Sequence, residues 1–330
     1  MVVHYRARII GTGSFLPPRV LTNHDLERMV DTSDEWITQR TGIKERRLVE
    51  PGTPTSALAL EAAKEALAAA GVGPEDISLI VLATITPDTL LPATACWVQD
   101  RLGATHAGAL DVAAACSGFL YALSIAATHV HANPKEKVLV IGAETLSYIT
   151  DFTDRSSCIL FGDGAGAAVV ARSDDPAVGF GPFALGSDGN GAEMMIVPAG
   201  GSLRPASHQT VDERLHYMKI RGREVYKFAV TKMVEMVAWA MEEGGITRDD
   251  LKLIIPHQVN VRILEAAARR LELTMEKIYM NIDRYGNTSA ASVPIALDEA
   301  VRAGKLEPGD PVVLVAFGGG LTWAACSLRW

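Results

Sequence analysis

The sequence predicts a layered α/β protein built from two similar halves, and three observations support this. Segments of the chain recur at a shift of 174 residues. Apolar, strand-like runs alternate with alanine-rich helical segments, which is typical of folds with mainly parallel sheets. No Ser/Gly-rich linker separates the two halves. We therefore expect an N-terminal half at 1–174 and a C-terminal half at 175–330, packed together as one unit.

The repeat rests on two pairs of segments that share one shift. Residues 71–81 align with residues 245–255, and in both a glycine and an acidic pair precede an alternating apolar run. Residues 134–141 align with residues 308–315 at the same shift. One match alone would be consistent with coincidence between two ordinary helix–turn–strand units. Two matches at one shift indicate an internal duplication.

Each half is expected to contain the same elements in the same order. After a first strand and a long insertion come a helix, two strands, a second helix, a further strand, a Gly-rich turn and a final strand. In the first half these include a helix at 56–70, strands at 109–113 and 137–142, and a helix at 117–132. In the second half they include a helix at 229–243, strands at 278–282 and 308–315, and a helix at 289–303. Helices so rich in alanine are thin enough to lie between two sheets.

Composition restricts the class of protein further. With 330 residues, 48% hydrophobic and 21% charged, the chain has the balance of a globular protein with a large core. Its net charge of −8 argues against nucleic acid as a partner, because phosphate binding requires clustered Lys and Arg. Polar residues or glycines interrupt the uncharged stretches 112–133 and 311–328, so no membrane span is expected.

The cysteines and the N-terminus indicate the compartment. The four cysteines, at positions 96, 116, 158 and 326, are too far apart in sequence for a metal knuckle or a redox pair. Residues 1–10 lack the basic start, apolar run and cleavage site of a signal peptide. We expect a cytoplasmic protein without metal.

Cys116 lies where a strand turns abruptly into a helix. Unpaired N–H groups and the helix dipole at that point are expected to stabilise a thiolate and lower the pKa of the thiol. Small neighbours from Ala113 to Gly118 would let a substrate approach closely. The alternative is a buried cysteine that behaves as a small apolar residue. Spacing alone leaves both interpretations open.

Two polar clusters follow predicted strands in the second half. His257 comes directly after an apolar run and Pro256, at the strand end where parallel sheets collect their sites. It could act there as a base or a hydrogen-bond donor, or merely cap the strand. Asn287 lies three residues from Ala290, the position that corresponds to Cys116 at the shift of 174. The duplication therefore places Asn287 opposite Cys116, although its local sequence is also typical of a turn and helix N-cap.

Two glycine-rich segments are candidates for binding. Residues 316–320, Ala-Phe-Gly-Gly-Gly, offer backbone N–H groups that could hold an oxyanion, or form a plain turn between strands. Residues 161–166, Phe-Gly-Asp-Gly-Ala-Gly, superficially resemble a nucleotide loop. A β-rich run follows them where a dinucleotide fingerprint would begin a helix, so NAD binding is not expected.

Taken together, these segments resemble the β-ketoacyl-acyl carrier protein synthase III family of the thiolase-like superfamily, nearly end to end. The matching motifs are Asp31-Thr-Ser-Asp-Glu-Trp36-Ile, Arg40-Thr-Gly-Ile, Ala114-Ala-Cys116-Ser-Gly-Phe, Phe161-Gly-Asp-Gly-Ala-Gly-Ala, Pro256-His257-Gln, Asn260-Val-Arg262-Ile, Gly286-Asn287-Thr-Ser and Phe317-Gly-Gly-Gly-Leu-Thr-Trp. The resemblance implies a thiolase-like five-layer αβαβα fold made of two duplicated halves. It also implies a homodimer and an enzyme that needs no cofactor besides its coenzyme A thioester substrate.

The activity implied by the resemblance initiates fatty acid biosynthesis. An acyl-CoA primer, expected to be acetyl-CoA, undergoes decarboxylative Claisen condensation with malonyl-acyl carrier protein through an acyl-cysteine. Cys116, His257 and Asn287 would be the catalytic residues, with the N–H groups of Cys116 and Gly319 as oxyanion hole. One alternative is a polyketide or secondary-metabolite starter enzyme with a different primer. Another, of a different class, is a non-catalytic module that binds CoA or a carrier protein.

The resemblance also implies binding residues. For CoA these are an adenine sandwich of Trp36 and Arg155, with Thr32, Arg40, Gly222, Asn260 and Arg262 as further contacts. For the acidic carrier protein they are a basic mouth formed by Arg221, Arg223, Lys227 and Arg262, which could otherwise be an ordinary solvated face. The residues implied for the acyl pocket are Phe317 and Leu91. Leu91 lies on a loop that, in this family, reaches across the dimer interface. Because Leu91 is smaller than the aromatic residue common there, it leaves room for a longer or branched primer.

Overall fold

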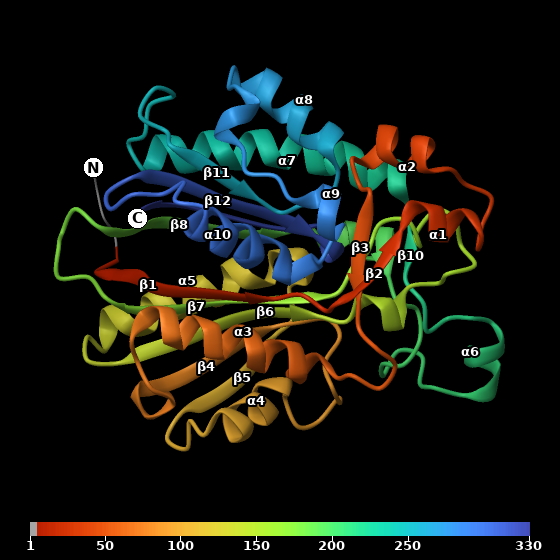
Figure 1. Cartoon of the computed structure of the whole chain (residues 1–330), viewed down its shortest axis with the longest axis horizontal. Coiled ribbons are helices and arrows are strands. Elements are labelled where there is room, and N and C mark those ends of the chain that lie inside the picture. The colour runs from red at the N-terminus through yellow and green to blue at the C-terminus, as the bar shows by residue number, and fades with distance from the viewer. Residues whose placement is uncertain (1–4) are drawn as a thin grey trace.

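The structure is a computed structural model that describes residues 5–330. Helices and sheets alternate in five layers (Figure 1). The outer helices α3 (Thr55–Ala70) and α4 (Thr94–Leu102) cover one sheet, and α7 (Gly222–Glu243) and α8 (Val261–Leu271) cover the other. Between the sheets lie α5 (Gly118–Ala132) and α10 (Ser292–Arg302). This order of layers confirms the αβαβα architecture.

The two sheets have corresponding strand orders. The first runs β1 (Ala7–Phe15), β7 (Gly164–Arg172), β6 (Lys137–Glu144), β4 (Ile77–Ala83), β5 (Gly108–Val112). The second runs β8 (Gly179–Ser187), β13 (Thr322–Arg329), β12 (Pro311–Gly318), β11 (Leu253–Pro256). The expectation of mainly parallel sheets is wrong, because among the described strands of these two sheets three pairs are parallel (β4–β5, β4–β6 and β11–β12) and the others are antiparallel. The last strand of each half returns antiparallel, after the long segment 145–163 in the first half and after the short Gly-rich turn 319–321 in the second.

The shift of 174 residues reappears in the backbone itself. Leu79 pairs with Val138 in the first sheet, and Leu253 pairs with Val312 in the second. The 3₁₀ turns η2 (Ala115–Ser117) and η6 (Ser289–Ala291) stand at the same shift, and each begins with a residue in the left-handed region, at φ 47° and 48°. The duplication is therefore confirmed. The boundary between residues 174 and 175 stays a prediction.

The predicted strand at 278–282 is wrong. Only Ile278 forms a β-bridge, with Ile254, and α9 (Ile282–Tyr285) begins soon after. The side chain of Gln258 replaces the missing ladder, since its Nε2 donates to the carbonyl of Tyr279 and its Oε1 accepts from the N–H of Asn281. A side-chain amide has thus taken over the hydrogen bonds of a strand neighbour.

Small residues let the middle layer approach the sheets closely. A Cβ added at Gly142 would come within 2.3 Å of the carbonyl oxygen of Ala290, so η6 rests directly on β6. Alanines of α5 and α10 fill the core between the sheets. In the described part of the chain, no helix is long and apolar enough to cross a membrane.

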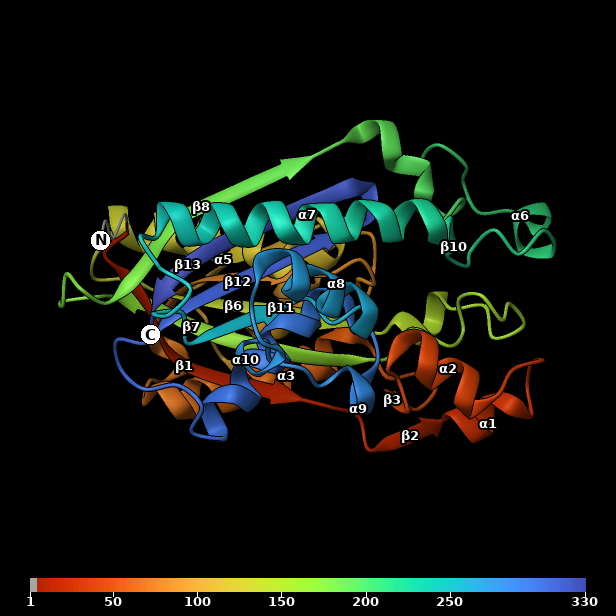
Figure 2. The ribbon, with the colours of Figure 1, turned by 90° about the horizontal axis from the view of Figure 1, so that it is seen from above.

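Smaller elements gather at one end of the molecule (Figures 1 and 2). They are β2 (Arg19–Thr22), α1 (Asn23–Glu27), α2 (Asp34–Thr41), β3 (Glu45–Leu48), β9 (Met195–Ile196), α6 (His208–Asp212) and β10 (Lys219–Ile220). The loop at 198–217, which includes α6, extends beyond the layers there. The start of α7 lies at the same end.

Candidate active site

Cys116 lies in η2, between the end of β5 and the start of α5, as the sequence predicts. The thiol is buried, and this burial raises its pKa to about 12. A hydrogen bond with Ser289 acts in the opposite direction but is the smaller effect. The expectation of a lowered pKa is therefore wrong, because loss of hydration penalises the thiolate more than its local partners stabilise it.

The triglycine segment lies directly against Cys116. A Cβ added at Gly318 would stand 2.6 Å from the backbone nitrogen of Cys116 and 3.1 Å from its Cβ. The corresponding point on Gly319 is 3.6 Å from the Cβ of Ala115. Any side chain at Gly318 would thus displace the Cys116 backbone, which explains the glycine at this position.

His257 follows the last residue of β11, and its N–H donates to the carbonyl of Val315 at 2.8 Å. The imidazole stands edge-on to Phe317, with ring centroids 5.7 Å apart. Within residues 5–330 its buried Nδ1 has no hydrogen-bond partner. Burial lowers the pKa of His257 to about 3, so the ring is neutral at physiological pH.

Two backbone hydrogen bonds fix the position of Asn287. Its N–H donates to the carbonyl of Leu160, and its carbonyl accepts from the N–H of Gly162. The side-chain Oδ1 accepts from the N–H of Ser289 at 2.9 Å, which sets the direction of the amide nitrogen. The interpretation of Asn287 as a turn-forming residue is therefore confirmed, and its catalytic role stays a prediction.

Two series of contacts bring the three predicted residues together. Along one, Cys116 touches the Gly318 backbone, and the neighbouring Phe317 packs against His257. Along the other, Cys116 and Asn287 each form a hydrogen bond with Ser289. A buried thiol, a neutral imidazole and an oriented amide therefore share one site at the carboxyl ends of β5 and β11.

An apolar cavity of about 320 Å³ adjoins this site. Ala115 and Gly319 form the wall nearest Cys116, and the remaining lining residues are Ile85, Ile149, Met195, Ile196, Val197 and Met218. The sequence interpretation missed this lining, because it comes from four separate segments. Leu91 does not line the cavity. It projects from its own chain with 87% of its surface exposed, next to Leu90 at 90%.

The residues proposed for adenine binding form a cluster around α2. The guanidinium carbon of Arg155 lies 4.5 Å from the centroid of the Trp36 ring, and that of Arg40 lies 5.2 Å from it. Arg155 also pairs with Asp31 at 3.5 Å. The sandwich is therefore closed, and a base could enter only after Arg155 moves. Thr32 belongs to the same region, and its buried Oγ1 is without a partner among the described residues.

Asn260 and Arg262 connect this cluster to α8. Asn260 caps the helix by accepting from the N–H of Arg262, and its Nδ2 donates to the carbonyl of Arg40. The Nε of Arg262 donates to the carbonyl of Gln39. Both side chains thus have structural roles that the resemblance did not imply.

The remaining basic residues are exposed at the start of α7. Arg221 precedes the helix and pairs with Glu193 at 3.5 Å, while Arg223 and Lys227 lie in its first turns. Apart from Gly222 itself and its chain neighbours, no atom of residues 5–330 lies within 4 Å of the point where a Cβ of Gly222 would be. Both views place this end of α7 at the same end of the molecule as α2 (Figures 1 and 2).

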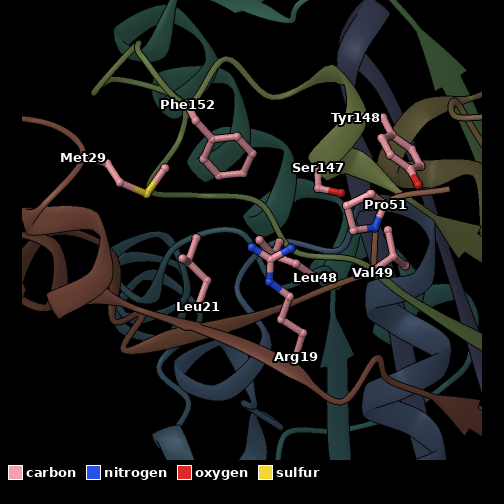
Figure 3. A pocket seen from close by; sticks show the side chains of 9 residues that line it. All are labelled: Arg19, Leu21, Met29, Leu48, Val49, Pro51, Ser147, Tyr148 and Phe152. Atoms are coloured by element: carbon pink, nitrogen blue, oxygen red, sulfur yellow. The ribbon is translucent and has the colours of Figure 1, made fainter. Parts of the chain in front are cut away.

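A second cavity, of about 230 Å³, lies beside the antiparallel pair of β2 and β3 (Figure 3). Arg19 projects into it among mainly apolar side chains, including Leu21, Leu48 and Phe152. Its lining contains no residue of the predicted site. In the chain from Tyr5 onward, no cluster of three His, Cys, Asp or Glu side chains could hold a metal ion.

Comparison with known proteins identifies the family. The model of the 3-oxoacyl-[acyl-carrier-protein] synthase III C-terminal region matches residues 241–330, and that of 3-oxoacyl-[acyl-carrier-protein] synthase III matches residues 110–189. The β-ketoacyl-[acyl-carrier-protein] synthase III of Caldanaerobacter subterraneus is 55% identical over 98% of both chains. The chain belongs to this family. It is therefore a condensing acyltransferase with the thiolase-like fold, and the resemblance read from the motifs is confirmed.

Solved structures agree with this assignment. The 3-oxoacyl-[acyl-carrier-protein] synthase III of Aquifex aeolicus superposes with a TM-score of 0.90 at 48% identity, covering 98% of this chain and all of the other. The priming β-ketosynthase of the R1128 polyketide pathway superposes with a TM-score of 0.91 at 37% identity, covering 100% and 97%. The synthase III fold is thus shared with an enzyme of polyketide synthesis.

Proposed function

We propose that this condensing enzyme initiates fatty acid synthesis by joining an acyl-CoA primer to malonyl-acyl carrier protein. The observation that carries the proposal is the shared site of Cys116, His257 and Asn287, with a neutral imidazole beside a buried thiol. The reaction occurs in two half-reactions at one cysteine. Family membership supports the reaction class, and the contacts described above support the role of each residue.

In the first half-reaction, the sulfur of Cys116 attacks the thioester carbonyl of the primer. The thiol is neutral at rest, so its proton must leave as the carbon–sulfur bond forms, and the neutral ring of His257 can accept it. The N–H groups of Cys116 and Gly319 stabilise the tetrahedral oxyanion. Coenzyme A leaves as a thiol after taking a proton, and the acyl group remains on Cys116.

In the second half-reaction, malonyl-acyl carrier protein loses CO₂, and the electron pair of the broken bond forms an enolate. His257 and Asn287 donate hydrogen bonds to the thioester oxygen that becomes negative. The enolate carbon attacks the acyl group and the thiolate of Cys116 leaves, taking up a proton. A neutral histidine suits this task, because it can donate throughout without a change of charge.

The binding roles are proposed residue by residue. Trp36 and Arg155 enclose the adenine of CoA, with Thr32, Arg40, Gly222, Asn260 and Arg262 contributing contacts along the path to Cys116. Two observations support this: the stacked Trp36–Arg155 pair, and the Oγ1 of Thr32, which has no hydrogen-bond partner within residues 5–330. The apolar cavity beside Cys116 and the packed ring of Phe317 support a site for the pantetheine and acyl chains.

The partners are an acidic carrier protein and a second copy of the chain. Arg221, Arg223, Lys227 and Arg262 give the acidic protein an exposed basic mouth at the entrance end. Exposed leucines at positions 90 and 91 support burial of their loop against the acyl pocket of a second subunit. The cytoplasmic location and the division into halves at residue 174 remain predictions.

Mass spectrometry of the intact protein tests the proposal. We expect incubation with acyl-CoA to add one acyl mass, and Cys116→Ala to abolish the adduct. A panel of acetyl-, isobutyryl- and octanoyl-CoA reports primer choice together with the nucleophile. Strict preference for acetyl-CoA would contradict the expectation that Leu91 leaves room for larger primers. A wild-type chain that forms no adduct and no condensation product would instead be a binding module.

The similarity to a polyketide priming ketosynthase supports one alternative, in which the same chemistry starts a polyketide chain. The two proposals differ in the carrier protein that delivers the malonyl group. Condensation rates with a fatty acid carrier protein and with a polyketide carrier protein distinguish them. Faster turnover with the fatty acid carrier supports the first proposal.

A further inference from the structure

A buried carboxylate adjoins the candidate site and has no part in the mechanism above. Glu144 ends β6 and has no exposed surface. Its Oε2 accepts from the Thr84 hydroxyl at 3.1 Å, the Ile85 N–H at 3.1 Å and the Thr86 hydroxyl at 2.8 Å. Its Oε1 accepts from the Ser289 hydroxyl at 2.9 Å. Both oxygens are therefore occupied, by two different parts of the chain.

The internal repeat shows why this position matters. Adding 174 to Glu144 gives Gly318, the residue whose backbone lies against Cys116. Each central strand thus ends beside the 3₁₀ turn of the opposite half, Gly318 beside η2 and Glu144 beside η6. At the Cys116 side the strand end has no side chain. At the Asn287 side it carries a carboxylate that binds the turn.

Ser289 connects this carboxylate to Asn287. Its hydroxyl donates to Glu144, and its backbone N–H donates to Oδ1 of Asn287. Ser289 holds a left-handed φ of 48°, which a non-glycine residue adopts only when its surroundings fix it. The bond to Glu144 is one such constraint. Without it, the N–H that directs the Asn287 amide loses a fixed position.

We propose that Glu144 is a positioning residue for the decarboxylation step: through Ser289 it orients the Asn287 amide, and through residues 84–86 it fixes the adjoining cavity wall. The inference deepens the proposed function and rests on it. Ile85 links the second part to the site, since it donates to Glu144 and lines the apolar cavity. Burial raises the pKa of Glu144 to about 7, although its hydrogen bonds from Thr86, Ile85 and Ser289 favour the charged form.

The geometry predicts different effects for two substitutions. Glu144→Ala removes the acceptor that the donors of Thr84, Ile85, Thr86 and Ser289 share, and the turn that directs Asn287 is released. Glu144→Gln can keep its carbonyl oxygen on the three donors of residues 84–86 and turn its NH₂ toward the Ser289 oxygen. Positioning therefore survives in the glutamine variant, whereas a role as proton acceptor would not.

The two half-reactions give separate readouts. The acyl adduct on Cys116 is followed by intact mass, and CO₂ release from malonyl-acyl carrier protein is followed on enzyme that has already been acylated. We expect Glu144→Ala to slow CO₂ release roughly 10- to 100-fold, less than the loss for removing a direct donor. Acylation should fall by a smaller factor than CO₂ release, because Glu144 reaches Cys116 only indirectly, through the Ser289 hydrogen bond and the cavity wall. Glu144→Gln should keep both rates near those of the wild type.

Asp298→Asn is the matched control. Asp298 is another buried carboxylate, but its partners Thr12, Ser14 and Arg302 lie on β1 and α10. Asp298→Asn should leave the rates of acylation and CO₂ release unchanged, even if it lowers the thermal stability of the protein. If Glu144→Ala fails to fold, Ser289→Ala on pre-acylated enzyme tests the same link. It should slow CO₂ release, and adding Glu144→Gln should cause no further loss.

Two results would overturn the inference. One is an equal loss of acylation and CO₂ release in Glu144→Ala, which indicates general damage. The other is a glutamine variant as slow as the alanine variant, which indicates proton transfer instead of positioning. A wild-type enzyme that forms no acyl adduct would refute the proposed function itself, and this outcome is distinct from both.

Discussion

Burial controls the protonation of the two ionisable side chains proposed for catalysis. It raises the pKa of Cys116 to about 12 and lowers that of His257 to about 3, because in each case the charged form loses its hydration. Both side chains are therefore neutral near pH 7. A thiolate forms only as the substrate is attacked, which protects the cysteine from reaction with other electrophiles in the absence of a thioester.

The neutral state of His257 gives a spectroscopic prediction. Its ring resonances, assigned by comparison with a His257→Asn variant, should not titrate between pH 5 and pH 8 in NMR spectra. His24 is the internal control, since a hydrogen bond with Glu27 raises its pKa above the ordinary 6.5 and its ring should therefore be charged at pH 5, where that of His257 should be neutral. His257 binds a proton near pH 6.5 in the unfolded chain and only near pH 3 in the folded protein. Its contribution to the stability of the fold is therefore fully present above pH 6.5 and is lost as the pH falls from 6.5 to 3, because the unfolded state binds this proton first. Titration of His257 near pH 6.5 would contradict the assignment.

The resting pair of Trp36 and Arg155 gives a second prediction at the scale of residues. Adenine must replace the guanidinium on the Trp36 ring, and stacking on an aromatic ring contributes about 1–3 kcal/mol per base. Trp36→Ala should therefore raise KM for acyl-CoA roughly 10-fold or more. KM for acyl-pantetheine, which lacks the nucleotide, should stay unchanged. Steady-state acylation with both substrates measures the difference, and equal effects on both would contradict adenine stacking.

At the scale of elements, the strand end at Gly318 must approach η2 closely. A Cβ there would meet the backbone nitrogen of Cys116 at 2.6 Å, and that nitrogen is a proposed oxyanion donor. Gly318→Ala should slow acylation by roughly 100-fold or more, because the donor is displaced. Gly201→Ala is the control, since a Cβ there meets no atom within 4 Å. Stopped-flow acylation measures both, and an unaffected Gly318 variant would exclude the proposed oxyanion hole.

Some of the helices, strands and turns could be predicted from the sequence, and others could not. Periodicity and the shift of 174 predicted the layers, the main helices and the turns that carry Cys116 and Asn287, because these depend on local patterns. Local patterns could not show that residues 278–282 do not form a strand. Two of their backbone hydrogen bonds are made to the side chain of Gln258, which belongs to another segment. Glu144 was missed as well. A carboxylate at the end of an apolar strand was the available signal, but its partners come from two distant segments.

At the scale of the molecule, charge is unevenly distributed. The chain carries a net charge of −8, yet Arg221, Arg223 and Lys227 are exposed together at the start of α7. An acidic carrier protein would be repelled by most of the surface and attracted there, so docking depends on a small number of residues. Screening by salt should weaken such docking more than it weakens binding of the CoA nucleotide by stacking.

This distribution predicts the effect of charge reversal. Arg223→Glu with Lys227→Glu should raise KM for malonyl-acyl carrier protein roughly 10-fold or more. The rate of acylation by acyl-CoA should remain close to that of the wild type. The control is Arg269→Glu with Arg270→Glu, which changes the net charge equally at exposed positions near the end of α8. Equal effects of the two pairs would show that overall charge governs the encounter. An effect confined to the α7 pair assigns the docking surface to the mouth beside α2, where the pantetheine arm must enter.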